Sequence, residues 1–158
     1  MNEHENSSFS PPDVDVHLSC ESLSIDPQQV QRLARFVLAE EKKEHLGLSV
    51  AFINDEDIAS MNKAYLNHEG PTDVISFPLL EDHDSDWILG EVVVSLDTAL
   101  RQAAEFQREP LWEALLYVVH GTLHLLDYDD HDPKDKAKMH ARQEQLLEDF
   151  LAKDNLKT

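Results

Sequence analysis

The segment that most constrains the fold comprises residues 111 to about 126, directly after Pro110. Its apolar residues lie on two sides of the helical wheel rather than in one stripe; they include Leu115, Leu116, Val118, Val119, Leu123 and Leu125. A helix with apolar residues all round belongs in the core of a domain, and Pro is favoured at a first helical position. The sequence therefore predicts a central buried helix around which the other elements pack.

Two histidines, His120 and His124, lie four residues apart on this predicted helix. Residues at this spacing lie about one turn apart on one face, so both imidazoles can reach a single ion. Such a pair also occurs by chance and is then more often a surface or core feature than a ligand pair. On the most apolar helix of the chain, however, two unpaired imidazoles are costly to bury. This setting favours a metal site.

A third ligand is expected from the segment after the helix. Asp127 stands where a left-handed residue closes a helix, and the Asp132-Pro133 pair starts another one. The chain can reverse between them and bring Asp130 or His131 over the histidine pair. Three protein ligands leave a fourth position for water, as in catalytic zinc sites, whereas closed structural sites generally use four. We therefore predict one divalent ion, zinc or a similar metal, at an open site.

The remaining patterns predict an α+β fold in which helices pack on a small mixed sheet of about four strands. Apolar runs predict strands at residues 14–18, 48–53, 74–77 and 91–95. Helices are predicted at residues 27–41, from 55 through Tyr65, at 96–106 and from 133 to about 150. The first strand–helix–strand units should be right-handed crossovers between parallel strands, and the last two strands are close enough for an antiparallel pair.

The length of 158 residues suits one domain. We expect a disordered tail at residues 1–12, a single metal-binding domain at 13–152 and a polar tail at 153–158, with a solvated acidic loop at 81–86. One cysteine, Cys20, allows no internal disulfide. No apolar run approaches the ~20 residues of a membrane span, and the N-terminus has no signal-peptide pattern. We expect a cytoplasmic protein with no membrane partner.

The net charge of −19 argues against general attraction to nucleic acid, which normally depends on clustered Lys and Arg. No Lys or Arg lies between Lys63 and Arg101, although eight acidic residues do. A phosphate-bearing partner must therefore be bound by the metal, by backbone amides or by basic residues elsewhere in the chain.

Gly121 follows His120 where the common zinc-protease signature has its general base Glu. A base from elsewhere, such as Glu91, is required for proteolysis. The sequence therefore disfavours a metalloprotease, although the region without Lys or Arg suits a cationic substrate.

The run from His120 to Asp130, His-Gly-Thr-Leu-His-Leu-Leu-Asp-Tyr-Asp-Asp, resembles the metal motif of the YbeY family. That family comprises metal-dependent endoribonucleases that act in ribosomal RNA maturation and 70S ribosome quality control. Further matches are residues 62–65, the Pro-Thr-Asp-Val-Ile-Ser-Phe-Pro run at 71–78, and the Leu-Gly-Glu-Val run at 89–92. The resemblance covers about residues 48–139, in the order and spacing of the family.

This resemblance implies an α+β fold with the metal in a cleft, held by His120, His124 and Asp130, with His131 as the alternative third ligand. It also implies that Thr72, Asp73, Ser76 and Glu91 border the cleft. Glu91 is either a partner of a ligating imidazole or only the polar first residue of its strand. The implied activity is cleavage of single-stranded RNA, including 16S 3′ end processing, with the metal activating water. The implied partners are ribosomal RNA precursors and the ribosome or a ribosomal protein, with no DNA.

Three positions depart from the family pattern. The third His of the family is matched by Asp130, its Gly by Asp127, and its basic residue after the Tyr of the second helix by Leu66. A carboxylate oxygen is an acceptable zinc ligand. An Arg at position 66 would contact phosphate, so its absence favours the alternative of a non-catalytic ribosome assembly factor with a structural metal. A metalloprotease-like hydrolase is the third alternative.

Overall fold

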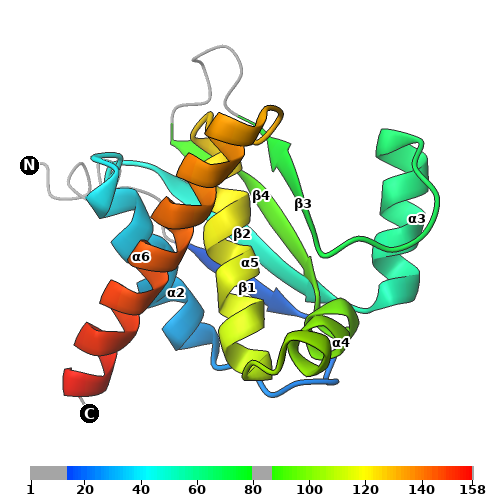
Figure 1. The fold of residues 1–158 in the computed structure, drawn as a ribbon, viewed down its shortest axis with the longest axis horizontal. Helices are drawn as coiled ribbons and strands as arrows, with labels where there is room; N and C mark the ends of the chain where they lie inside the picture. The colour runs from blue at the N-terminus through cyan, green and yellow to red at the C-terminus, as the bar shows by residue number, and fades with distance from the viewer. Residues whose placement is uncertain (1–13, 80–86, 158) are drawn as a thin grey trace, which may run out of the picture.

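The computed structural model describes residues 14–79 and 87–157 and shows the predicted α+β fold (Figure 1). The elements in chain order are β1 (Asp15–Leu18), α2 (Pro27–Glu40), β2 (Gly47–Ile53), α3 (Asp55–Leu66), β3 (Val74–Pro78), β4 (Ile88–Ser95), α4 (Leu96–Phe106), α5 (Pro110–Leu125) and α6 (Pro133–Lys157). Within the described ranges, no helix combines the length and the hydrophobicity needed to cross a membrane. The tail predicted at residues 1–12 and the loop at residues 81–86 lie outside the described residues.

The sheet has four strands in the order β1-β2-β4-β3. β1 and β2 are parallel, β2 and β4 are parallel, and β3 is antiparallel to β4. The parallel arrangement of β1 and β2 and the antiparallel pair of β3 and β4 were predicted correctly. The predicted parallel crossover from β2 to β3 was wrong. β4 takes the place beside β2, because α3 carries the chain out to the sheet edge and β3 then returns antiparallel.

Local side-chain chemistry explains where the helices begin and end. The side chains of Asp26, Asn54 and Ser95 each accept a hydrogen bond from a backbone N–H in the first turn of α2, α3 and α4. Asn67 and Gln107 end α3 and α4 in the left-handed conformation. Because these signals are local, the sequence located these helix ends well.

Helix α6 is longer than the sequence indicated. It continues to Lys157, past the expected end near residue 150, so the segment predicted as a polar tail is helical through residue 157. Asp154 is only 7% exposed and accepts hydrogen bonds of 2.8 and 3.1 Å from Arg32 of α2. This ion pair fastens the last turns of α6 to α2, and its two members are too far apart in sequence for periodicity to reveal it.

Helix α5 lies at the centre, in contact with β3, β4, α2, α4 and α6 (Figure 1). It shares the main core with Val92 and Val94 of β4. Val93 belongs instead to a smaller cluster under α3, on the other face of the sheet. Since side chains alternate along a strand, β4 presents every second residue to α5 and the others to the α3 side.

Gly121 allows α5 to approach the sheet closely. A Cβ at this position would lie 2.6 Å from Cγ1 of Val92, 3.1 Å from Cγ2 of Val74 and 3.1 Å from Oγ of Ser76. Ser76 also donates a hydrogen bond of 2.9 Å from Oγ to the carbonyl of Gly121. The C-terminal half of α5 is therefore held against β3, where the two histidines face a cleft.

Candidate metal centre

His120, His124 and Asp130 converge at the C-terminal end of α5. One ligand atom from each lies within 4.8 Å of the other two, and Nε2 of His124 is 3.5 Å from Oδ2 of Asp130. Zinc bonds of about 2.0–2.2 Å in a tetrahedral site place ligand atoms about 3.4 Å apart. The spacing and the donor types therefore fit a zinc ion with three protein ligands.

A buried glutamine orients His120. Nδ1 of His120 donates a hydrogen bond of 2.7 Å to Oε1 of Gln143, which is 5% exposed, on α6. With Nδ1 occupied, Nε2 carries the lone pair for a metal. Burial, against the opposing hydrogen bond to Gln143, lowers the pKa of the His120 imidazole. A neutral imidazole is the form that binds a metal ion.

The turn after α5 orients His124. Asp127 has a φ of 75°, its N–H donates to the His124 carbonyl at 3.0 Å, and the Tyr128 N–H donates to the Leu123 carbonyl at 3.0 Å. These two bonds form a Schellman motif. The motif returns the Tyr128 carbonyl to the helix end, where it accepts a hydrogen bond of 3.2 Å from Nδ1 of His124. His124 therefore also directs Nε2 towards the cluster.

The same turn is fastened to two distant helices. The Tyr128 hydroxyl donates to Oε1 of Glu41, at 3.1 Å, and Nε of Arg142 donates to Oε2 of Glu41, at 2.8 Å. Burial and the hydrogen bond to Glu41 raise the pKa of the Tyr128 phenol, which therefore stays protonated as the donor. The ligand loop is thus connected to α2 and α6 as well as to α5.

His131 takes a different position from Asp130. Its side chain is 88% exposed, and Nδ1 donates to Oδ1 of Asp129. It clusters with Asp129 and Asp130 rather than with the two histidines of α5. The hydrogen bond to Asp129 raises the pKa of His131, which favours the protonated form that cannot bind metal. Of the two alternatives for a third ligand, the structure brings Asp130 to the histidine pair.

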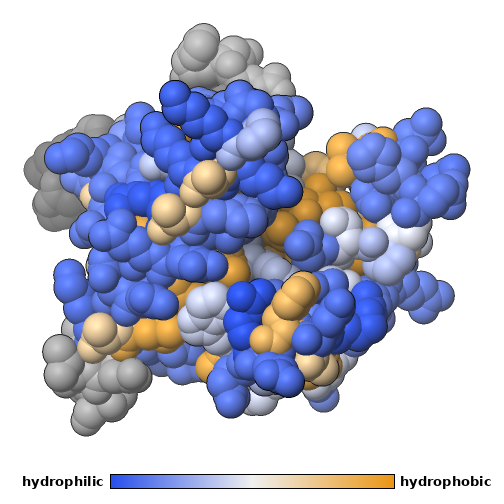
Figure 2. Space-filling view, viewed as in Figure 1, coloured by the Kyte–Doolittle hydropathy of each residue, from blue (hydrophilic) through white to orange (hydrophobic). Residues whose placement is uncertain are grey.

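The three residues line a cleft of about 400 Å³. The other lining residues are Leu66, Asp73, Val74, Ile75, Ser76, Pro78 and Leu125. Asp73 and Ser76 therefore border the cleft as the resemblance implied. Figure 2 shows apolar surface in the hollow between α6 and α3. Of the described residues that line the cleft, none is Lys or Arg.

Two of the four residues expected at the cleft do not line it. Thr72 instead donates a hydrogen bond of 3.4 Å from Oγ1 to Oδ1 of Asp73, which also accepts one of 2.7 Å from the Val74 N–H. Glu91 pairs with Phe77 across β3 and β4, next to Val92, whose side chain faces α5. Strand alternation therefore places Glu91 on the face away from the histidines, where it cannot orient a ligating imidazole.

Comparisons with known proteins agree with this geometry. A family model described as Endoribonuclease YbeY matches residues 15–151. The chain is 47% identical over 113 residues to the Endoribonuclease YbeY of Synechococcus sp. strain CC9605, covering 67% of each chain. It is 34% identical over 148 residues to that of Oceanobacillus iheyensis, covering 87% of this chain and 96% of the relative. The chain belongs to the YbeY family.

A solved structure supports the fold. The solution structure of a Thermotoga maritima protein matches with a TM-score of 0.64 over 91% of this chain and 93% of that one, at 22% identity. Membership of the YbeY family confirms the predicted enzyme class, a hydrolase that cleaves RNA phosphodiester bonds. YbeY nucleases are metal-dependent, and the His/Asp cluster is a site where this chain can bind a metal.

The groups that orient the candidate ligands in this YbeY chain were missed in the sequence analysis. Gln143 was visible only as a polar residue within the buried stripe of α6, between Met139 and Leu146. A polar side chain in such a stripe usually has a buried partner. No sequence signal connected Glu41 or Arg142 with the loop, because they contact it only in the folded chain.

Proposed function

We propose that this YbeY-family chain is a zinc-dependent endoribonuclease that cleaves single-stranded regions of ribosomal RNA precursors in the cytoplasm. The observation that carries the proposal is the convergence of His120, His124 and Asp130, with both imidazoles held by Nδ1 so that Nε2 is presented. We further propose processing of the 16S 3′ end and a role in ribosome quality control, in contact with the ribosome or a ribosomal protein. DNA is not an expected substrate.

Different residues of the cleft would bind the metal and form the apolar lining. His120, His124 and Asp130 hold the ion, which when bound supplies Lewis acidity towards a phosphate oxygen and acidifies water. Leu66, Pro78 and Leu125 form an apolar part of the cleft lining.

Asp73 is the remaining carboxylate of the cleft. Its Oδ1 is fixed by the Val74 N–H and the Thr72 hydroxyl, so the group has a defined orientation. We assign Asp73 the role of accepting a proton from the attacking water. Asp73→Asn should lower kcat by about 10²–10⁴-fold with zinc still bound. An unchanged kcat in the zinc-loaded variant would contradict this assignment.

The experiment that tests the activity uses single-stranded and duplex RNA with protein loaded with zinc, manganese or magnesium. Zinc-loaded protein should cleave the single strand, and His124→Ala should lose both the metal and the cleavage. His131→Ala is the matched control, because it removes an exposed histidine of the same loop outside the cluster. Absence of RNA cleavage by the metal-loaded wild type would contradict the nuclease proposal.

One observation favours the second candidate, a non-catalytic ribosome assembly factor. Leu66 lines the cleft, so the cleft walls described here offer no cationic side chain for a phosphate. An assembly factor should bind precursor RNA with or without zinc and leave it intact. Leu66→Arg separates the two candidates: it should increase the cleavage rate of a nuclease but only the RNA affinity of an assembly factor.

The metalloprotease alternative lacks a general base at the two positions that the sequence analysis considered for one. Gly121 packs so closely on the sheet that even a Cβ at this position would clash with Val92. Glu91 lies on the face of the sheet that points away from α5. Neither position can present a general base to the histidine pair.

A further inference from the structure

The positive charge of this acidic chain is concentrated in two segments. Residues 27–46 and 133–157, which contain α2 and α6, hold ten of the 13 Lys and Arg but eight of the 32 Asp and Glu. They carry a net charge of +2, and the rest of the chain carries −21. The three other cations, Lys63, Arg101 and Arg108, each form an ion pair with a carboxylate. A polyanion therefore meets the least repulsion along α2 and α6.

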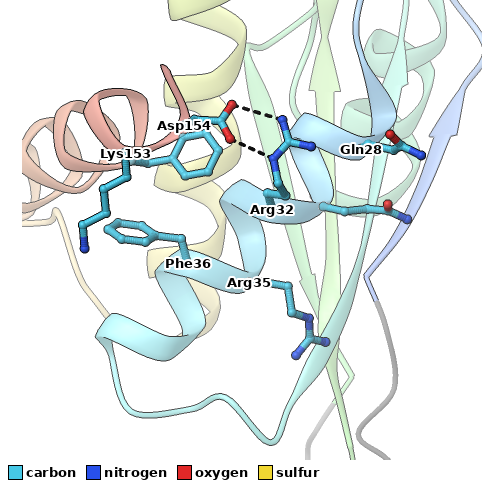
Figure 3. A pocket seen from close by; sticks show the side chains of 8 residues that line it. Gln28, Arg32, Arg35, Phe36, Lys153 and Asp154 are labelled. Atoms are coloured by element: carbon cyan, nitrogen blue, oxygen red, sulfur yellow. Dashed lines mark hydrogen bonds and ion pairs between the residues drawn. The ribbon is translucent and has the colours of Figure 1, made fainter. Parts of the chain in front are cut away.

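A cavity of about 590 Å³ lies between these two helices (Figure 3). We call it the α2–α6 pocket. Its lining residues are Gln28, Gln31, Arg32, Arg35 and Phe36 of α2, and Phe150, Lys153 and Asp154 of α6. Three cations and one carboxylate leave the pocket with a net charge of +2.

The floor of the α2–α6 pocket is aromatic. The rings of Phe36 and Phe150 lie 5.8 Å apart, tilted by 55°. Nζ of Lys153 lies 5.2 Å from the centre of the Phe36 ring, and Figure 3 shows the two side chains next to each other. Phe150 is only 4% exposed and Phe36 is half-buried, so the accessible aromatic surface is the open part of the Phe36 ring, beside the Lys153 ammonium. An ammonium group next to such a ring is suited to an anion that carries a planar apolar part.

The pocket already binds one anionic group of the chain itself. Arg32 donates from Nε and Nη2 to the two oxygens of Asp154, at 2.8 and 3.1 Å, and Gln29 donates to Asp154 at 3.3 Å. The Arg32 guanidinium is therefore held in a fixed orientation at the pocket wall. Lys153, the exposed residue directly before Asp154 in α6, is the cation placed to meet an external anion.

We propose that the α2–α6 pocket binds a nucleotide of single-stranded RNA outside the metal cleft, with its phosphate at Lys153 and its base against Phe36. This inference rests on the proposed function. Cationic side chains beside an aromatic platform are the combination with which proteins bind single strands. The exposed Gln28 amide adds a hydrogen-bonding group for a base edge, whereas Nε2 of Gln31 already donates to the Val14 carbonyl at 3.1 Å.

The cleft explains why such a site is useful. Its described lining includes Asp73 and Asp130 and lacks Lys and Arg, so it can hold few phosphates by itself. Helix α6 connects the two places: Gln143 contacts His120, and Lys153 lies ten residues further along, about 15 Å at 1.5 Å per residue. The pocket can therefore hold a part of the RNA strand outside the segment that lies in the cleft.

The test measures RNA binding by the full chain without metal, so that cleavage does not interfere. A fluorescein-labelled ten-nucleotide oligouridine is titrated, and its anisotropy gives Kd at several salt concentrations. Lys153→Glu should weaken binding at least fivefold and lower the salt slope by about 0.7, the value for one lost phosphate contact on a single strand. Lys43→Glu, an exposed residue outside the pocket with the same charge change, should weaken binding less than twofold.

Phe36→Leu tests the base contact, because it keeps an apolar floor without a ring, and circular dichroism verifies its fold. It should weaken oligouridine binding with the salt slope unchanged. Amide NMR shifts on titration should appear in α2 and the second half of α6.

Three results would overturn the inference: equal weakening by Lys153→Glu and Lys43→Glu, shifts confined to the cleft, or displacement of the RNA by a Glu-rich peptide that binds more tightly. Failure of the proposed nuclease function is a separate result. It appears as intact RNA with the zinc-loaded wild type, whether or not metal-free protein binds the oligouridine.

Discussion

Single hydrogen bonds select the nitrogen that each candidate ligand presents. His120 and His124 both engage Nδ1, one with a buried amide and the other with a backbone carbonyl. The carbonyl is available only because Asp127 adopts a left-handed conformation, which costs a residue other than Gly up to about 1–2 kcal/mol. Two hydrogen bonds of the Schellman turn offset this cost, so Asp serves where the YbeY family usually has Gly.

We expect Gln143→Leu to lower zinc affinity by about 10–100-fold, the usual effect of removing the partner of a ligating histidine. The variant keeps the size and the burial of the side chain but leaves Nδ1 of His120 without its acceptor. Competition with a chromophoric chelator measures the affinity.

Two variants control this prediction. Gln143→Glu retains an acceptor oxygen and should restore much of the affinity, which a merely structural role would not require. Gln145→Leu, an exposed glutamine on the same helix, should leave zinc binding unchanged. Equal zinc affinities for Gln143→Leu and Gln145→Leu would contradict the assigned role.

Between elements, the contact of α5 with the sheet depends on the absence of a side chain at Gly121. Ala favours helix by up to about 1 kcal/mol over Gly, but its Cβ would lie 2.6 Å from Val92 Cγ1. Overpacking of this kind typically costs about 1–3 kcal/mol. We therefore expect Gly121→Ala to lower the free energy of unfolding by about 1–2 kcal/mol, measured by urea denaturation.

The clash can be separated from other effects with a second change. Val92→Ala removes the methyl group that the Cβ introduced by Gly121→Ala would meet, so the double variant should lose less stability than the two single variants together. Additive losses would show that the close approach at Gly121 is not the cause.

A polar cluster joins the start of α3 to α4. Asp55 accepts hydrogen bonds from Ser95 at 2.7 Å and Thr98 at 2.8 Å, and it forms an ion pair with Arg101. Burial raises the pKa of the Asp55 carboxyl, but the hydrogen bonds from Arg101, Ser95 and Thr98 outweigh burial, so the pKa lies below its ordinary value of 3.8. The folded state therefore favours the ionised form.

The pH dependence of stability follows from this shift. Because the folded pKa is below the unfolded one, Asp55 contributes stability above about pH 3.8, and the contribution is lost as the pH falls through the folded value. Asp55→Asn should cost about 1–3 kcal/mol at pH 7, and its difference from wild type should shrink below about pH 3.8.

Urea midpoints between pH 2.5 and 7 measure this difference. Asp57→Asn, an exposed residue in the same helical turn, is the matched control. A loss for Asp55→Asn that stays constant over the whole range would contradict the electrostatic explanation.

Across the molecule, the candidate metal centre joins elements that are distant in sequence. The candidate ligands come from α5 and the loop after it, Gln143 comes from α6, and Glu41 at the end of α2 holds Tyr128. An ion that binds only the folded chain should therefore stabilise the whole domain. At a free zinc concentration of 100 Kd, the gain is about 2.7 kcal/mol.

We expect a chelator to remove this gain and to lower Tm in a scan with a single transition. His124→Ala should abolish the zinc-dependent shift, and His131→Ala should retain it because His131 lies outside the ligand cluster. A zinc-dependent shift that survives in His124→Ala would place the ion at another site.

The amino-acid pattern by itself determined most of the elements, the buried position of α5 and the family. These features depend on interactions between residues close in sequence: Asp26 and Asn54 start helices locally, and His120 and His124 share a helix face. The extra turns of α6 were missed because the ion pair that holds them joins Arg32 and Asp154, which are far apart in the sequence.

The sequence favoured Asp130 with His131 as the alternative, and only the tertiary structure shows that the Asp130 side chain lies beside the histidine pair, because one residue of loop register decides which side chain turns back towards α5. It also placed Glu91 on the far face of the sheet, since the register of β4 against α5 cannot be deduced from a strand's own residues. The histidine pair could be recognised from spacing alone. The position of the candidate third ligand and the partners that orient the pair depended on packing among helices that are far apart in the sequence.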